Sequence, residues 1–225
     1  MPVCSDCKAG CCRRTPVDLT GFDIMNISKT LDFDLSVFID VLPVKDKEVK
    51  LLSLETALFK FTDDECSKYY RFCLKRVPSR IIDDSYKCLF LQEWNDEILD
   101  LKTDKIFARC GIYSVRPLIC AIYPAKLDTN ELIGCIFDPS LHSKKTNNPA
   151  YTLCPRQLTK EDFTDYSGEI MKNLALYKFE VSFFISLAKH WNENPKSLKD
   201  LTDFLKKVYT NRIVFPELID CPENV

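Results

Sequence analysis

Twelve cysteines and only two histidines, His142 and His190, set the strongest constraint on this chain of 225 residues. Cysteine makes up about 5% of the residues, below the roughly 8–10% of short disulfide-stapled domains. The start of the sequence shows no secretory signal pattern, so we expect a cytoplasmic protein whose thiols stay reduced. Many reduced cysteines in such a chain favour metal ligation over disulfide bonds, although cysteine is also a common core residue.

The densest group of cysteines comprises Cys4, Cys7, Cys11 and Cys12. The two residues between Cys4 and Cys7 let both sulfurs turn toward one ion, about 2.3 Å from each. A dithiol redox site has the same spacing, but it usually begins a helix within a βαβ unit, and we see no such unit before Cys4. On an extended backbone, adjacent side chains point to opposite sides. Cys11 and Cys12 are therefore expected to serve different metals or cluster edges, or one of them to pack in the core.

Composition and charge argue against several other classes of protein. Hydrophobic residues make up 46% and charged residues 28% of the chain, which is typical of a folded domain. The net charge of −2 gives no basic field for nucleic acid. The longest uncharged stretch in the apolar C-terminal region, residues 181–188, is too short to span a membrane. We therefore expect neither nucleic acid nor a membrane as a partner.

Capping and periodicity signals predict helices and strands of modest length in the first third of the chain. Thr20 and Asp23 form a capping box that opens one helix. A helical turn is expected over 34–41, ended by Pro43, and a strand over 49–61. A further capping box, Thr62 with Glu65, predicts a helix that carries Cys66, Tyr69, Tyr70 and Cys73.

The rest of the chain changes from short elements to long helices. Residues 79–138 predict short strands and loops, with turns that carry Cys88, Cys110 and Cys120. A long helix is expected from its cap at Thr159 and Asp162 to Pro195. Its apolar stripe comprises Phe163, Tyr166, Ile170, Leu174, Tyr177, Val181, Phe184, Ala188 and Trp191. Ser197 and Asp200 cap a last helix.

These elements together predict an α+β fold, in which a small irregular cysteine-ligated core of short strands and helices is followed by C-terminal helices. We expect a cysteine-cluster metal-binding domain over 1–156 and a C-terminal helical segment over 157–225 that packs on the same domain.

The second cysteine motif runs from Cys110 to Pro124, as Cys-Gly-Ile-Tyr-Ser-Val-Arg-Pro-Leu-Ile-Cys-Ala-Ile-Tyr-Pro, and follows a Cys-Leu-Phe-Leu sequence at Cys88. Together with the N-terminal group, it resembles the YkgJ-like cysteine-cluster family, also described as a zinc- or iron-chelating domain. The matching positions are Cys4, Cys7, Cys11, Cys12, Cys88, Leu91, Cys110, Ile112, Tyr113, Arg116, Pro117, Cys120, Tyr123 and Pro124, with Cys154 best placed as the final cysteine. Cys135 is a rival for that last position.

The resemblance implies eight metal ligands, namely Cys4, Cys7, Cys11, Cys12, Cys88, Cys110, Cys120 and Cys154. Eight thiolates suit two four-coordinate metals, or a cluster plus a separate ion. Zinc and iron–sulfur both stay open, and the scarcity of histidine slightly favours an iron–sulfur cluster. We interpret the chain as a cytosolic metal-binding protein. The same resemblance extends distantly to lysine N-methylases, so a cluster-containing protein-modifying enzyme is the alternative, with a protein substrate or a redox partner.

Overall fold

Helices and short antiparallel strands alternate along the chain, and the fold is α+β, as the sequence predicts. The computed structural model describes residues 9–14, 16–64, 68–94, 107–123, 125–126, 135–136 and 167–212. The helices are α1 (Cys11–Arg14), α2 (Gly21–Leu31), α3 (Leu35–Phe38), α4 (Asp46–Leu52), the 3₁₀ helix η2 (Tyr113–Val115), α6 (Leu118–Ile122), α8 (Ser167–Glu193) and α9 (Leu198–Asn211). The strands are β1 (Ile39–Val44), β2 (Tyr69–Leu74), β3 (Arg76–Pro78), β4 (Tyr86–Cys88), β5 (Leu91–Trp94), β6 (Phe107–Cys110), β7 (Ala125–Lys126) and β8 (Cys135–Ile136).

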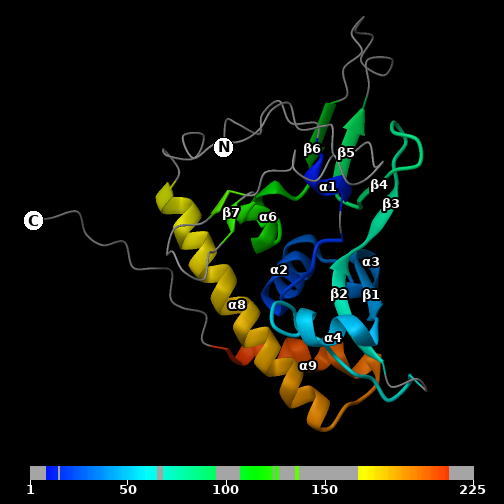
Figure 1. Cartoon of the computed structure of the whole chain (residues 1–225), viewed down its shortest axis with the longest axis vertical. Helices are drawn as coiled ribbons and strands as arrows, with labels where there is room; N and C mark the ends of the chain where they lie inside the picture. Colours follow the sequence, from blue (N-terminus) through cyan, green and yellow to red (C-terminus); the bar gives the residue numbers. More distant parts are fainter. Residues whose placement is uncertain are drawn as a thin grey trace, which may run out of the picture.

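The described strands form four separate antiparallel pairs, β1–β2, β3–β4, β5–β6 and β7–β8. In the longest pair, Ile39 lies opposite Leu74 and Val44 opposite Tyr69. A two-stranded ribbon is only marginally stable by itself. The ribbons therefore depend on the helices around them, and Figure 1 shows α2 lying between the β1–β2 pair and the long helix α8.

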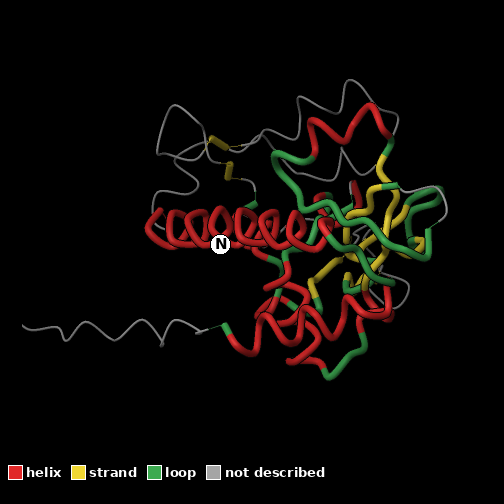
Figure 2. Tube along the Cα trace, turned by 90° about the horizontal axis from the view of Figure 1, so that it is seen from below, coloured by secondary structure: helices red, strands yellow, loops and turns green. Residues whose placement is uncertain are grey.

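An aromatic core, defined here as Phe59, Phe61, Phe72, Phe184 and Trp191, joins the β1–β2 region to α8. The ring of Phe59 lies 5.1 Å from that of Phe72 and 5.2 Å from that of Phe184, centre to centre. The indole N–H of Trp191 donates to the carbonyl of Lys60 at 2.8 Å, so its polar atom is also satisfied. In Figure 2, one end of α8 reaches the main group of strands, whereas its other end extends away from them.

Most of the predicted stripe of α8 is buried, while Tyr177 and Val181 of the same stripe are half-buried. Ile170, Leu174, Phe184, Ala188 and Trp191 are all buried, and they recur at helical spacing. The predicted cap at Thr159 and Asp162, together with Phe163 and Tyr166, lies outside the described residues. Among the described helices, none is both long and apolar enough to cross a membrane.

Two of the predicted capping boxes are confirmed, at Thr20 and at Ser197, while Glu65 of the box predicted at Thr62 lies outside the described residues. The Asp23 carboxylate accepts hydrogen bonds from the backbone N–H and the hydroxyl of Thr20 at the start of α2, at 2.9 and 2.7 Å. At the start of α9, the Asp200 carboxylate does the same for Ser197.

Two predicted elements are wrong because long-range pairing and charge placement override local alternation. The expected helix with Tyr69, Tyr70 and Cys73 is the strand β2, since its aromatic residues pair with β1; Cys66 itself lies outside the described residues. The expected strand over 49–61 begins as helix α4, where acidic residues occupy the first turn and Lys50 the last. Only Phe59 of that segment forms a bridge, to Tyr70.

The turn expected over 34–41 is a shorter helix than predicted. The Asp34 carboxylate caps α3 by accepting from Ser36 N–H at 2.8 Å, and the chain becomes strand β1 at Ile39. Pro43 therefore sits inside β1, opposite Tyr70, rather than ending a helix.

One buried cluster of apolar side chains contains residues of α2 and β2 together with residues of α8 and α9. The C-terminal helices thus share a core with the preceding part of the chain. The predicted domain boundary at 156 lies outside the described residues and stays a prediction.

Candidate metal centre

Five of the eight predicted ligands lie in the described part of the chain, on four separate elements. Cys11 and Cys12 belong to α1, Cys88 and Cys110 end the strands β4 and β6, and Cys120 lies in α6. The position of Cys120 corrects the predicted turn, because Pro117 begins a short helix there. Cys4, Cys7 and Cys154 lie outside the described residues. Cys135, the rival for the last position, begins strand β8 opposite Lys126.

The sulfurs of Cys11 and Cys12 lie 3.9 Å apart. This corrects the prediction that the two side chains point to opposite sides, because the backbone here is helical rather than extended. Two sulfurs bound to one tetrahedral ion, each about 2.3 Å from the metal, would lie about 3.8 Å apart. The pair therefore has the spacing of two ligands on one ion.

The thiols of the two cysteine motifs interact electrostatically with one another. Burial raises the pKa of Cys120 well above its usual value, and negative charge on Cys11, Cys88 or Cys110 would raise it further. Burial also raises the pKa of Cys88 to about 11, with contributions from Cys110 and Cys11. The thiols at these positions therefore stay protonated near neutral pH unless a cation compensates their charge. All are free of disulfide bonds.

The described thiols form a cluster rather than a closed coordination sphere. In residues 9–212, apart from the segments left undescribed, no three His, Cys, Asp or Glu side chains stand ready to hold one ion. A complete ligand set therefore requires movement of these thiols on binding, or sulfurs from the predicted ligands Cys4, Cys7 and Cys154.

The loop after Cys88, at the end of β4, contacts the chain just after Cys110, at the end of β6. The N–H of Gly111 donates to the carbonyl of Phe90 at 2.9 Å, next to Cys110. A Cβ at position 111 would lie 3.1 Å from that carbonyl oxygen, which is tighter than an ordinary contact. Glycine after Cys110 thus allows the close approach of the Cys88 loop.

A buried ion pair that sequence reasoning missed holds α1 against the β5–β6 hairpin. Arg13, which follows Cys12, contacts the Glu93 carboxylate of β5 at 2.5 Å, and the side chains are 0% and 2% exposed. Ser79 Oγ accepts from Arg13 at 3.0 Å and lies 3.1 Å from the carboxylate. Burial alone would raise the pKa of Glu93, but hydrogen bonds from Arg80 N–H and Arg13 lower it overall. No motif marks either residue, since each reads as an ordinary surface charge.

Arg116, one of the positions that match the family, lies close enough to Cys110 for their charges to interact. Its guanidinium sits 3.9 Å from the centre of the Tyr113 ring. Burial raises the pKa of Cys110, and the positive charge of Arg116 opposes that effect. Arg116 thus favours the thiolate form of Cys110.

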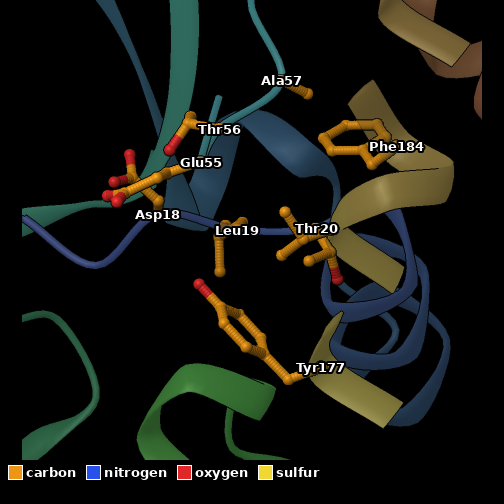
Figure 3. A pocket seen from close by; sticks show the side chains of 9 residues that line it. Asp18, Leu19, Thr20, Glu55, Thr56, Ala57, Tyr177 and Phe184 are labelled. Atoms are coloured by element: carbon orange, nitrogen blue, oxygen red, sulfur yellow. The ribbon is translucent and has the colours of Figure 1, made fainter. Parts of the chain in front are cut away.

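A small cavity lies between α8, which contributes Tyr177, and the segments around Asp18 and Glu55 (Figure 3). The Tyr177 hydroxyl points toward these two carboxylates (Figure 3), and burial is the main reason that its pKa rises to about 12. The cavity measures about 10 Å³, which is room for about one water molecule. It is too small to receive an organic substrate.

The described structure is an α+β domain in which thiols from α1, β4, β6 and α6 lie close enough for their charges to interact. The chain belongs to the CxxCxxCC family, described as "Putative zinc- or iron-chelating domain", whose model matches residues 3–155. The family predicted from the motifs is thereby confirmed, and its description supports metal binding. No curated protein and no solved structure matches the chain.

Proposed function

We propose that this protein binds a metal centre through the thiolates of Cys4, Cys7, Cys11, Cys12, Cys88, Cys110, Cys120 and Cys154. The observation that carries this proposal is that the thiols of Cys11, Cys88, Cys110 and Cys120, from positions up to about a hundred residues apart in the sequence, lie close enough for their charges to interact. Nothing in chain connectivity alone requires Cys11 and Cys120 to meet.

Metal binding gives these buried thiols a physical reason to gather. Thiolates packed together cost free energy through desolvation and mutual repulsion, which is why these thiols stay protonated when no cation is bound. A bound cation replaces the protons and cancels the repulsion, so its affinity also stabilises the fold. The 3.9 Å spacing of the Cys11 and Cys12 sulfurs is consistent with this role.

The family match supports Cys154 as the eighth ligand. The matched range, 3–155, begins one residue before Cys4 and ends one residue after Cys154. Eight thiolates are sufficient for two four-coordinate ions, or for a cluster and a separate ion.

An iron–sulfur cluster is the favoured occupant, slightly ahead of zinc. The histidine in the described residues, His190, has a side chain 74% exposed and pairs with Glu193 on α8. It therefore adds no imidazole to the thiols, and an all-sulfur ligand set suits iron–sulfur clusters as well as all-cysteine zinc sites. When bound, a cluster would supply one-electron chemistry, whereas zinc would supply structural stability.

The test is anaerobic purification followed by elemental analysis, acid-labile sulfide determination and a visible spectrum. We expect iron with sulfide in a brown protein whose broad absorption fades on reduction. A colourless protein with about two zinc ions would replace the cluster with zinc and keep the ligand set. A stably folded protein that contains neither metal would contradict the proposed function.

A further inference from the structure

Asp23 connects two helices that are far apart in the sequence. One carboxylate oxygen, Oδ2, accepts from the N–H and the hydroxyl of Thr20 and so completes the capping box of α2. The other oxygen, Oδ1, accepts from the N–H of Leu118, the first residue of α6, at 2.8 Å. The side chain is 2% exposed, and both of its oxygens are therefore used inside the protein.

The bond to Leu118 fixes the helix that carries Cys120. Pro117, which precedes Leu118, has no N–H, so the Leu118 amide is the first that α6 can offer. Cys120 lies two residues further on, and its own N–H donates to the Pro117 carbonyl at 2.8 Å. A short chain of bonds thus leads from Asp23 to the Cys120 backbone.

The opposite end of α6 is closed within the helix, where the Tyr123 N–H donates to the Ile119 carbonyl at 3.1 Å. Helix α6 has only five residues, Leu118–Ile122, and its apolar side chains Leu118 and Ile122 pack inward. Apolar packing permits small sliding and rotation, whereas a hydrogen bond to a buried carboxylate sets one direction. The position of the Cys120 sulfur therefore depends on where Asp23 holds the start of α6.

We propose that Asp23 is a positioning residue for the metal centre, which holds α6 so that the Cys120 thiol faces the thiols of Cys11 and Cys88. This inference rests on the proposed function. The capping of α2 alone does not account for Asp23, because Asp200 caps α9 with the same box while remaining on the surface. The added feature at Asp23 is the bond to a residue 95 positions away.

Three variants separate positioning from ordinary helix capping. Asp23→Asn cannot serve both donors, since its amide nitrogen must face Thr20 or Leu118. Asp23→Glu keeps the negative charge, and glutamate also suits the capping box, but the longer side chain moves the carboxylate by one methylene relative to Leu118. Thr20→Val is the matched control, because it removes the capping hydroxyl at the same buried place and leaves the Asp23–Leu118 bond intact.

The experiment titrates Co²⁺ into metal-free, reduced protein and follows the sulfur-to-cobalt absorption band, with chelator competition to measure affinity. The near-ultraviolet circular dichroism of the aromatic core reports the folded fraction, so that binding is expressed per folded molecule. We expect both Asp23 variants to bind Co²⁺ about 10- to 100-fold more weakly, as for other residues that orient metal ligands. The band per bound ion should fall by about a quarter if one of four thiolates is displaced.

The outcomes distinguish this inference from the proposed function. Wild-type protein that gives no sulfur-to-cobalt band would contradict the proposed function itself. Wild-type binding with Asp23→Asn and Asp23→Glu no weaker than Thr20→Val would overturn the positioning role. Loss of stability without loss of band in the folded molecules would also overturn it, because a merely structural role predicts that result.

Discussion

The aromatic core and the region of the cysteine cluster have interiors of different chemical character. Figure 1 shows the elements that carry them, with α9 at one end of the molecule and α1 with the β5–β6 pair toward the other. Towards α9, Phe59, Phe184 and Trp191 bury large rings against one another with their polar atoms satisfied. Around α1 and the β5–β6 hairpin, the interior contains thiols and the Arg13–Glu93 ion pair. Burial of apolar area stabilises the first region directly.

The second region also buries charge, because the Arg13–Glu93 ion pair loses its hydration when the chain folds. Its stability therefore depends on correct pairing and, on our account, on a bound metal. Mutations in the two regions should therefore have effects on stability and on metal retention that can be separated. Changes in the aromatic core should alter global stability, whereas changes around the thiols should alter metal retention as well.

The largest expected effect on stability comes from Phe184→Ala. Phe184 is 2% exposed and packs against Phe59 and Phe72. Its truncation should lower the free energy of unfolding by about 3–5 kcal/mol through lost burial and a cavity. Urea unfolding measures the loss, and elemental analysis of the folded fraction should show unchanged metal per molecule. Metal loss from protein that is still folded would contradict the expectation that the aromatic core affects stability without affecting metal content.

Glu93→Gln should have the next largest effect, and it should act on both properties. The neutral side chain leaves Arg13 buried without its counter-charge, which should lower the free energy of unfolding by about 3 kcal/mol. Because Arg13 follows Cys12, we also expect faster transfer of metal to a chelator. Urea unfolding and the rate of metal transfer check the two effects.

The double variant Arg13→Met with Glu93→Leu is the control for that prediction. It removes both charges, so most of the stability should return. A double variant as unstable as Glu93→Gln would show that the ion pair itself, rather than the orphaned charge, accounts for the loss.

Asn192→Ala should have the smallest measurable effect. The amide of Asn192 donates to the Leu58 carbonyl at 2.7 Å and accepts from Lys60 N–H at 2.8 Å, beside the aromatic core. Loss of these neutral bonds should lower the free energy of unfolding by about 1–2 kcal/mol, without any change in metal retention. Glu193→Gln, which affects a largely exposed pair with His190 on the same helix, should change neither quantity measurably. Asn192→Ala that released metal would show that the two regions are coupled.

The sequence predicts well those features that depend on local signals. The capping boxes at Thr20 and Ser197 and the buried stripe of α8 follow from short-range spacing, and all are present. Strand β2 could not be predicted in this way, because Tyr69 and Tyr70 pair with a strand some 26 residues earlier in the chain, Tyr70 opposite Pro43 and Tyr69 opposite Val44. Nonlocal pairing leaves no periodic signal that distinguishes it from a helix over so few residues.

The candidate site shows the same limit. Cysteine spacing identifies which side chains carry the chemistry, since their number and clustering are visible in the sequence. The residues that hold them do not stand out: Glu93 pairs with a residue 80 positions earlier, and Asp23 bonds to one 95 positions later. Such contacts depend on the tertiary fold, and a charged residue in the sequence looks the same whether it is buried or solvated.

The most direct test of the proposed metal centre is the metal content of two matched cysteine variants, Cys88→Ser and Cys73→Ser. Both cysteines are buried, but Cys88 interacts with the thiol cluster, whereas Cys73 lies on β2 and donates to the Asp18 carboxylate at 3.2 Å. After anaerobic purification, Cys88→Ser should lose about one four-coordinate metal site, and Cys73→Ser should retain wild-type metal content. Equal metal content in wild type and both variants would contradict the assignment of the cysteine cluster as the metal centre.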